Sequence, residues 1–195
     1  SSAPRSFSES RPMPGMSPVR KAAQSVRLVL MDVDGVMTDG SILFVDAKSE
    51  GRIFDAKDGV GIWLLRRAGI VTGVISGRTS PAVKRRVREL GMEEIHLKVT
   101  NKLEVYEEIL TRKGLSDDSV CFIGDDVVDL GVLERAGLSV APSDAHPVVR
   151  RSVRFVTRAE GGRGAVREVA DLILAAQGKD VEVLRSMRRG RPWAS

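Results

Sequence analysis

The chain has 195 residues, of which 42% are hydrophobic and 29% charged, a balance typical of one globular domain. Its net charge of +5 lies at the two ends: residues 1–25 and 179–195 each carry +3, whereas residues 26–178 carry −1. A nucleic-acid-binding domain concentrates basic side chains on its folded surface, so this distribution argues against a nucleic-acid partner. No run of apolar residues reaches the length of a membrane span.

The sequence predicts one folded domain between two loosely structured ends. Residues 1–25 are rich in Ser, Pro and Arg and lack the apolar stretch of a signal peptide, so we expect a disordered leader. Residues 26–178 form the expected domain, and residues 179–195 a basic tail. The single cysteine, Cys121, has no partner for an internal disulfide, which favours a reducing, cytoplasmic location.

Within the expected domain, β-rich runs alternate with amphipathic segments. The six expected strands are at 27–33, 70–76, 94–98, 119–124, 138–141 and 154–157. The six expected helices are at about 59–68, 80–90, 101–113, 126–136, 145–151 and 164–176. This alternation predicts an α/β fold, a doubly wound parallel sheet of the Rossmann-like type with helices on both faces.

One region breaks the alternation directly after the first expected strand. Two short β-type runs, at about 41–45 and 51–55, flank a polar turn that ends in Gly51. Such a pair predicts a β-hairpin.

Polar side chains follow the expected strands at the points where each strand ends. Asp32 and Asp34 follow the first strand, Ser76 ends the second, Lys102 comes after the third, and Asp125 follows the fourth. The carboxyl ends of parallel strands meet at one edge of the sheet, so we expect these side chains to converge. Clustered carboxylates are unfavourable unless a cation compensates them, and oxygen ligands suit Mg²⁺. The pattern therefore predicts magnesium-dependent phosphoryl transfer.

Each of these residue types has a role in such a reaction. Asp32 would attack phosphorus and form an aspartyl-phosphate, and Asp34 would act first as general acid and then as general base. Ser76 and Lys102 would bind the phosphoryl oxygens. Each motif alone has a plainer interpretation as a turn, a loop or a helix cap, and their order at successive strand ends is what favours a site.

The four motifs resemble the signature motifs of the haloacid dehalogenase-like phosphatases. The matching residues are Asp32-Val-Asp-Gly-Val-Met-Thr-Asp39, Ser76-Gly-Arg, Lys102 and Gly124-Asp-Asp-x-x-Asp129. Within that superfamily, residues 55–59, 144–147 and the glycine-rich 161–168 are similar to the family of 3-deoxy-D-manno-octulosonate 8-phosphate phosphatases. The resemblance covers about residues 26–178.

This resemblance implies a haloacid dehalogenase-like fold without a cap domain, and a homotetramer in which neighbouring chains complete each active site. It implies Mg²⁺ held by the Asp32 carboxylate, the Asp34 carbonyl and Asp125. It also implies hydrolysis of an eight-carbon sugar-acid phosphate, a precursor of lipopolysaccharide. The implied substrate contacts are Asp34, Asp55, Ala56, Lys57, Asp58, Gly59, Trp63, Arg78, Arg86 and Lys102.

Arg78 bears on which sugar acid is the substrate. Related phosphatases for nine-carbon sialic-type sugars commonly have Thr-Gly-Glu in place of Ser76-Gly-Arg, so the arginine favours the eight-carbon acid, whose carboxylate its fork of donors matches. The chain departs from the family pattern at Lys57, usually Arg, and at Asn101, usually Asp. Trp63 has two interpretations, a wall of the pocket and a side chain of the core.

Two other functional classes share part of the pattern. A signalling receiver domain also combines an aspartate, a lysine and magnesium on a doubly wound sheet, but its phosphoacceptor ends the third strand, whereas Asp32 ends the first. A non-catalytic oligomerising relative would lack Asp32 or Lys102, and both are present. The two histidines, His96 and His146, give no zinc-binding pattern.

Overall fold

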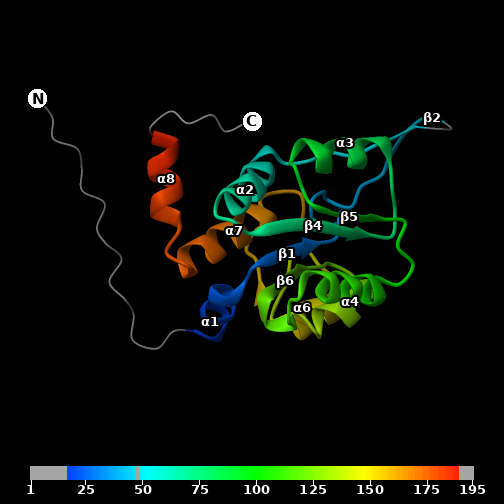
Figure 1. Ribbon diagram of the computed structural model, residues 1–195. Coiled ribbons are helices and arrows are strands. Elements are labelled where there is room, and N and C mark those ends of the chain that lie inside the picture. Colours follow the sequence, from blue (N-terminus) through cyan, green and yellow to red (C-terminus); the bar gives the residue numbers. More distant parts are fainter. Residues whose placement is uncertain (1–16, 47–48, 189–195) are drawn as a thin grey trace, which may run out of the picture.

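A computed structural model describes residues 17–46 and 49–188, which fold around a six-stranded parallel sheet (Figure 1). The strand order is β5-β4-β1-β6-β7-β8. The strands are β1 (Leu28–Met31), β4 (Val71–Ser76), β5 (Glu94–Leu97), β6 (Val120–Ile123), β7 (Leu138–Ala141) and β8 (Phe155–Val156). The chain adds strands first to one side of β1 and then to the other, so the crevice where ligands bind in such sheets lies at the carboxyl end of β1.

Helices cover both faces of this sheet (Figure 1). One face carries α1 (Pro18–Ser25), α2 (Ala56–Arg67), α3 (Pro81–Glu89) and α7 (Ala165–Ala176). The other carries α4 (Lys102–Lys113), α5 (Leu130–Leu133) and α6 (Pro147–Ser152). The remaining elements are the 3₁₀ turns η1 (Asp117–Ser119) and η2 (Val127–Asp129) and the helix α8 (Asp180–Arg188). The predicted fold class is confirmed.

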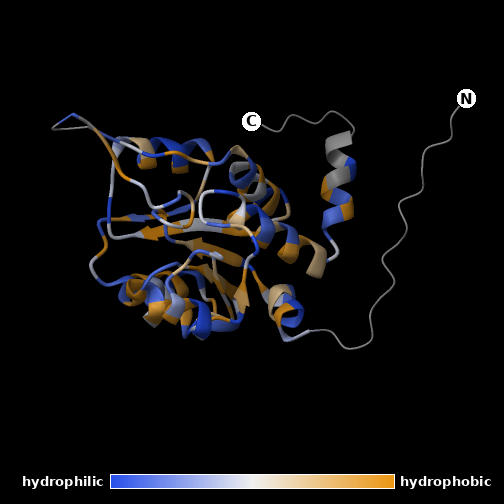
Figure 2. Ribbon diagram, turned by 180° about the vertical axis from the view of Figure 1, so that it is seen from behind, coloured by the Kyte–Doolittle hydropathy of each residue, from blue (hydrophilic) through white to orange (hydrophobic). Residues whose placement is uncertain are grey.

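The sheet is buried on both sides, as its apolar strands require. Val29 and Met31 of β1 belong to the core cluster under α2 and α7, whereas Leu28 and Leu30 belong to the cluster under α4. Successive side chains of a strand point to opposite faces, so one four-residue strand joins both halves of the core. The hydropathy colouring shows the same sandwich, with apolar strands between helices that are polar on their outer sides (Figure 2).

The predicted hairpin is present but its second strand is shorter than expected. The two antiparallel strands, β2 (Leu43–Asp46) and β3 (Ser49–Gly51), project beyond the sheet beside α3 (Figure 1). The expected run at 51–55 leaves the ladder after Gly51 because Arg52 turns inward to Asp34 and Asp55 caps α2.

The disorder predicted for residues 1–25 is wrong for residues 18–25, which form α1. Ser17 caps this helix by accepting a hydrogen bond from the Arg20 N–H, and Ala23 is fully buried. The side-chain amide of Gln177 donates to the carbonyls of Ala23 and Val26, so the helix is tied to the end of α7. Residues 1–16 lie outside the described part of the chain.

The other differences concern the lengths of elements late in the chain. Residues 180–188, predicted as tail, form α8, and residues 189–195 lie outside the described part. The helix expected at 126–136 is divided into η2 and α5, because the Asp129 side chain accepts hydrogen bonds from the backbone at Asp125 and Asp126 and tightens the first turn. None of the described helices is long and apolar enough to cross a lipid bilayer.

Candidate active site

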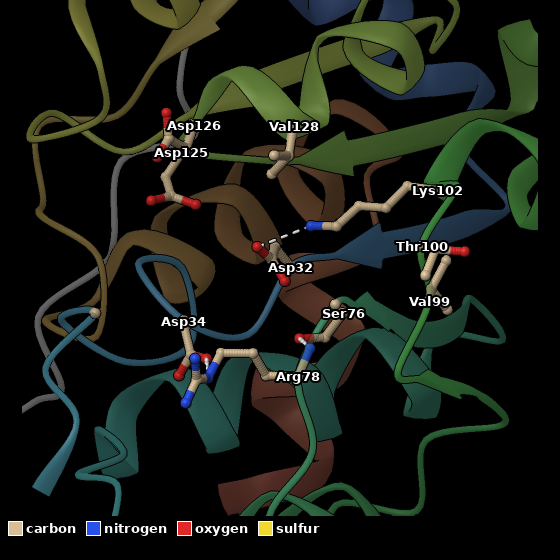
Figure 3. Close-up of a pocket in the computed structure, with 12 residues that line it drawn as sticks. Asp32, Asp34, Ser76, Arg78, Val99, Thr100, Lys102, Asp125, Asp126 and Val128 are labelled. Carbon is tan, nitrogen blue, oxygen red and sulfur yellow. Dashed lines mark hydrogen bonds and ion pairs between the residues drawn. The ribbon is translucent and has the colours of Figure 1, made fainter.

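The polar residues predicted to converge do so at the carboxyl edge of the sheet, around a pocket of about 410 Å³ (Figure 3). Asp32 directly follows β1, and its N–H still donates to the Ile123 carbonyl at 3.0 Å, which fixes the end of β1 against β6. The pocket is lined by Asp32, Asp34, Gly40, Ser76, Gly77, Arg78, Val99, Thr100, Lys102, Asp125, Asp126 and Val128. The predicted site residues Asp32, Asp34, Ser76, Arg78, Lys102 and Asp125 are therefore in one place.

Lys102 connects two carboxylates at the floor of this pocket. Its Nζ lies 2.8 Å from Oδ2 of Asp32 and 2.7 Å from Oδ1 of Asp129. Lys102 is the first residue of α4. The N-cap residue of this helix, Asn101, accepts a hydrogen bond from the Glu104 N–H, so the helix start is fixed and holds the ammonium group of Lys102 in the pocket. Burial opposes the charge of Lys102, but the two carboxylates outweigh this and raise its pKa above its ordinary value.

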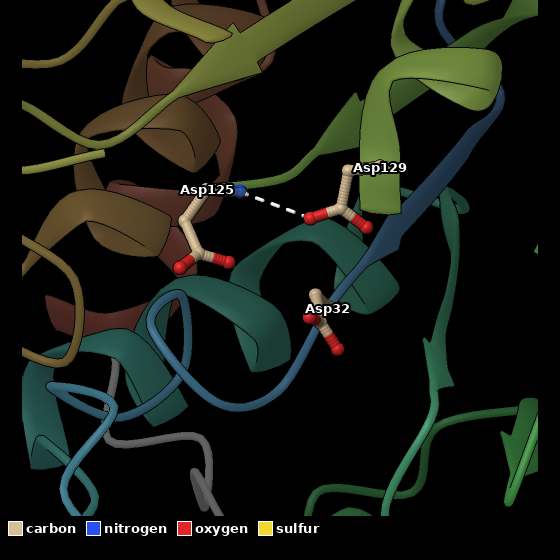
Figure 4. A group of neighbouring side chains, drawn as sticks. All are labelled: Asp32, Asp125 and Asp129. Atoms are coloured by element: carbon tan, nitrogen blue, oxygen red, sulfur yellow. Dashed lines mark hydrogen bonds between the residues drawn. The ribbon is translucent and has the colours of Figure 1, made fainter. Parts of the chain in front are cut away.

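Asp32, Asp125 and Asp129 form an acidic group whose ligand atoms lie within 4.8 Å of one another (Figure 4). Both oxygens of Asp129 are used: Oδ1 accepts from Lys102, and Oδ2 accepts from the Asp125 N–H at 3.1 Å. In contrast, the buried Oδ1 of Asp125 has no hydrogen-bond donor among the described residues. Asp129 therefore orders the loop, and Asp125 offers a free ligand atom.

The negative charge of this group is only partly balanced by Lys102. Burial, together with the nearby carboxylates of Asp32 and Asp129, raises the pKa of Asp125 to about 7. Burial also raises the pKa of Asp32, although Lys102 acts against this. A carboxylate that is this reluctant to ionise, with an oxygen that lacks a partner, fits a site completed by a divalent cation.

Ser76 and Arg78 line the pocket from the end of β4. The Ser76 hydroxyl accepts a hydrogen bond from the Arg78 N–H at 3.4 Å, and the Arg78 side chain is half exposed. Figure 3 shows the Arg78 guanidinium beside Asp34, with its Nε 3.8 Å from Oδ2 of that carboxylate. Its Nη2 also lies 3.3 Å from Oε1 of Glu50 in the hairpin.

Two residues of this site were missed by the sequence analysis, Arg52 and Glu50. Arg52 lies just beyond β3, and its Nε donates to Oδ1 of Asp34 at 2.6 Å. Glu50 accepts hydrogen bonds from both Arg52 and Arg78. In the sequence, only the two charged residues of the predicted hairpin could have indicated this role, and charged side chains on a hairpin are ordinarily exposed to solvent.

The glycine-rich segment that begins at Gly161 supports the loop after Asp32. The Gly162 N–H donates to the Val36 carbonyl at 2.9 Å, and the Gly161 N–H donates to Oδ1 of Asp144. A Cβ at Gly161 would overlap the Gly35 carbonyl, so only glycine permits this close approach of two backbones.

Residues 55–59, predicted as substrate contacts, lie at the start of α2 and do not line the pocket formed by the described residues. Asp55 is the N-cap of α2 and pairs with Lys57, while Ala56 and Lys57 are exposed. Asp58 is buried and accepts hydrogen bonds from the N–H groups of Gly164 and Arg167, so within one chain it caps the start of α7.

Trp63 and Arg86, the other two predicted contacts, also lie away from the pocket within one chain. Trp63 packs against the core cluster with the Arg67 guanidinium over its ring, which supports its core interpretation. Arg86 lies against the Phe54 ring and above Gly59, where a larger residue would collide with the guanidinium. Arg86 lines a separate hollow of about 370 Å³ with Arg52 and Arg85. Their role toward a substrate stays a prediction.

Comparison with known proteins agrees with this geometry. Residues 88–168 match the model of a haloacid dehalogenase-like hydrolase family. Over 166 residues the chain is 40% identical to the 3-deoxy-D-manno-octulosonate 8-phosphate phosphatase of Escherichia coli (strain B / BL21-DE3), covering 85% of this chain and 88% of the relative. The chain belongs to the family of 3-deoxy-D-manno-octulosonate 8-phosphate phosphatases.

Solved structures of this octulosonate phosphatase family superpose closely on the fold. The Yersinia pestis phosphatase gives a TM-score of 0.82 at 41% identity, covering 84% of this chain and 88% of that one. The Moraxella catarrhalis phosphatase, solved with magnesium, phosphate and KDO, gives 0.84 at 33% identity, covering 88% and 99%. Membership of this family, with both Asp32 and Lys102 in place, does not favour the receiver-domain and non-catalytic alternatives.

Proposed function

We propose that this chain is a magnesium-dependent phosphatase that hydrolyses 3-deoxy-D-manno-octulosonate 8-phosphate to the free sugar acid and phosphate, a step toward lipopolysaccharide. The observation that carries the proposal is the grouping of Asp32, Lys102 and Asp125 at the carboxyl edge of the sheet, with Arg78 on the rim. Family membership supports both the chemistry and the substrate.

The carboxylates of Asp32 and Asp125 and the main-chain carbonyl of Asp34 would hold Mg²⁺. The free Oδ1 of Asp125 and its raised pKa support this set, whereas Oδ1 of Asp129 accepts from Lys102 and its Oδ2 from the Asp125 N–H, so we do not assign Asp129 as a third carboxylate ligand. The bound cation supplies charge compensation between the phosphate dianion and the carboxylates. We therefore assign Asp129 to holding Lys102 and the loop after β6.

In the first step, an Asp32 oxygen forms a bond to phosphorus while the bond from phosphorus to the sugar oxygen breaks. Asp34 donates its proton to that departing oxygen, so the sugar leaves as a neutral alcohol. The Lys102 ammonium, already 2.8 Å from Asp32, and the Ser76 hydroxyl bind the transferred phosphoryl oxygens. The products of this step are an aspartyl-phosphate and the free sugar acid.

In the second step, the Asp34 carboxylate takes a proton from a water molecule that attacks the aspartyl-phosphate. The bond from phosphorus to Asp32 breaks, which releases inorganic phosphate and restores the Asp32 carboxylate. Asp34 ends the cycle protonated, ready for the next substrate.

For the substrate's own carboxylate we propose Arg78, whose half-exposed guanidinium borders the pocket. The contacts proposed for Asp55 to Gly59, Trp63 and Arg86 then require a neighbouring chain or a further part of the sugar, since these residues lie outside the pocket of one chain. The single cysteine, fully buried at Cys121, supports a cytoplasmic location.

The substrate assignment is tested by phosphate release from eight- and nine-carbon sugar-acid phosphates. We expect turnover of the eight-carbon compound in Mg²⁺, none after chelation, and recovery when Mg²⁺ is restored. The eight-carbon compound should have the higher kcat/KM, because Arg78 stands where nine-carbon phosphatases commonly have glutamate. A higher kcat/KM for the nine-carbon compound would overturn the inference that Arg78 selects the eight-carbon acid.

We further propose a homotetramer in which neighbouring chains cover each pocket. Exposed apolar side chains support this: Leu43 and Phe44 on the hairpin are 62% and 70% exposed, and Val128 on the pocket rim is 67% exposed. A capless site also needs a cover to exclude water. Sedimentation equilibrium should give four times the chain mass, and Phe44→Glu should lower that mass; a wild-type monomer at micromolar concentration would contradict the proposal.

A further inference from the structure

The Arg52 side chain links the hairpin to the catalytic loop. It lies directly after β3, yet its side chain is 1% exposed and its Nε donates to Oδ1 of Asp34 at 2.6 Å. That is a short, charge-assisted hydrogen bond between a buried cation and the residue assigned as proton donor. Eighteen residues separate the two in sequence, so the contact depends on how the hairpin docks.

The guanidinium of Arg52 is held on its other side as well. Its Nη2 donates to Oε2 of Glu50 at 3.2 Å, and its Nη1 donates to the Gly51 carbonyl at 3.0 Å. Asp34 and Glu50 together raise the pKa of Arg52 although burial opposes its charge. A buried arginine with three directed hydrogen bonds has little freedom to turn, so it fixes whatever it contacts.

Asp34 depends on this contact for its orientation. Among the described residues, Arg52 is the one side chain that donates a hydrogen bond to the Asp34 carboxylate, since Arg78 Nε lies 3.8 Å from its other oxygen. Asp34 itself is only 19% exposed at its side chain and sits on the pocket wall. The Nε–H of Arg52 donates to Oδ1, so Oδ2 is the oxygen of Asp34 that accepts no hydrogen bond from the described side chains.

We propose that Arg52 is a positioning residue that holds Oδ1 of Asp34, so that Oδ2 faces the departing oxygen of the substrate. The proposal rests on the proposed function, in which Asp34 protonates the leaving alcohol. Glu50 acts through Arg52 by holding its far side. The position of the hairpin thereby determines, through the Arg52 side chain, the geometry in which Asp34 transfers its proton.

This role predicts a dependence on the leaving group. A sugar alkoxide leaves only if it is protonated, whereas a nitrophenolate of low pKa leaves without a proton. Misplacing Asp34 should therefore slow the sugar phosphate far more than p-nitrophenyl phosphate. Loss of a merely structural contact would slow both substrates by the same factor.

The test compares Arg52→Gln, Arg52→Lys and wild type on the eight-carbon sugar-acid phosphate and on aryl phosphates of increasing leaving-group pKa. For Arg52→Gln we expect kcat on the sugar phosphate to fall about a hundredfold, the size of loss that a small misplacement of a catalytic group causes. KM should change little, and the rate on p-nitrophenyl phosphate should fall only severalfold. Arg52→Lys keeps the charge but loses the fork, so it should recover about tenfold of the loss.

Arg85→Gln is the matched control. Arg85 is 82% exposed at its side chain and pairs only with Glu89 among the described residues, so this variant should behave as wild type on every substrate. Thermal melting of each variant establishes that it is folded before its rates are compared. An equal loss across the leaving-group series in folded Arg52→Gln would overturn the proposal.

A double-mutant cycle with Asp34→Asn gives a second, independent measurement. If Arg52 acts through Asp34, adding Arg52→Gln to Asp34→Asn should lower kcat no further, whereas independent roles would multiply. The aryl phosphate series also separates this proposal from the proposed substrate. A wild-type chain that hydrolyses aryl phosphates but no octulosonate phosphate would refute the substrate, while the leaving-group dependence would still decide the role of Arg52.

Discussion

Asp32→Asn should abolish phosphate release, lowering kcat by at least about 10⁴-fold while the protein stays folded. The amide occupies the same volume as the carboxylate but cannot attack phosphorus, so no aspartyl-phosphate forms. Release of phosphate from the octulosonate phosphate in saturating Mg²⁺, measured to the detection limit, checks the rate. Rapid quenching and mass measurement should find a phosphorylated wild-type chain and an unmodified variant.

The same substitution should not destabilise the protein without metal. Asp32 is 8% exposed and belongs to a group of three carboxylates that a single lysine compensates in part. Removing one negative charge relieves repulsion between like charges, and Lys102 keeps its contact with Asp129. The melting temperature of metal-free Asp32→Asn should therefore equal or exceed that of wild type, as when a site optimised for function is relaxed.

Asp118→Asn is the control for this experiment. Asp118 is exposed in η1, before the amino end of β6, and the same chemical change there should leave both kcat and melting temperature unchanged. Turnover by Asp32→Asn within tenfold of wild type would show that another group is the nucleophile.

The strand-end residues could be predicted because their position depends on local rules alone. The carboxyl ends of parallel strands lie at the same edge of a sheet, and β4 and β6 both pair in parallel with β1. Asp32, Ser76 and Asp125 follow from that edge, and Lys102 follows from the cap that starts α4. Their meeting in one pocket requires no knowledge of side-chain packing.

The residues that escaped prediction, or were given a different role, depend on contacts between distant segments. The groups that Asp58 binds, the N–H groups of Gly164 and Arg167, lie 106 and 109 residues away, so no local pattern predicts its place at the start of α7. Arg52 was missed because nothing local specifies that a hairpin side chain turns inward toward Asp34. α1 was missed because its apolar face is small, and burial of Ala23 against the core stabilises it more than its own propensity.

The binding of Mg²⁺ should weaken as the pH falls below 7, by about tenfold for each pH unit, because a proton and the cation compete for the same carboxylate. Burial and the neighbouring Asp32 and Asp129 carboxylates raise the pKa of Asp125 to about 7, and only its ionised form is a ligand. Calorimetric titration of metal-free protein with Mg²⁺ between pH 5.5 and about 8 measures this slope, which should level off above pH 7. Asp125→Asn should bind Mg²⁺ at least about a hundredfold more weakly, with little dependence on pH.

The same carboxyl gives the metal-free protein a stability that falls with rising pH. The pKa of Asp125 is raised in the folded chain from 3.8 to about 7, so the folded state binds more protons than the unfolded state between these values. Its stabilising contribution is complete below pH 3.8 and is lost as the pH rises through 7. Saturating Mg²⁺ should cancel this loss, because the ionised carboxylate then has a cation beside it, and Asp125→Asn should remove it in the metal-free protein. Metal binding that is equally tight from pH 5.5 to about 8 would exclude Asp125 as the ligand whose charge the cation compensates.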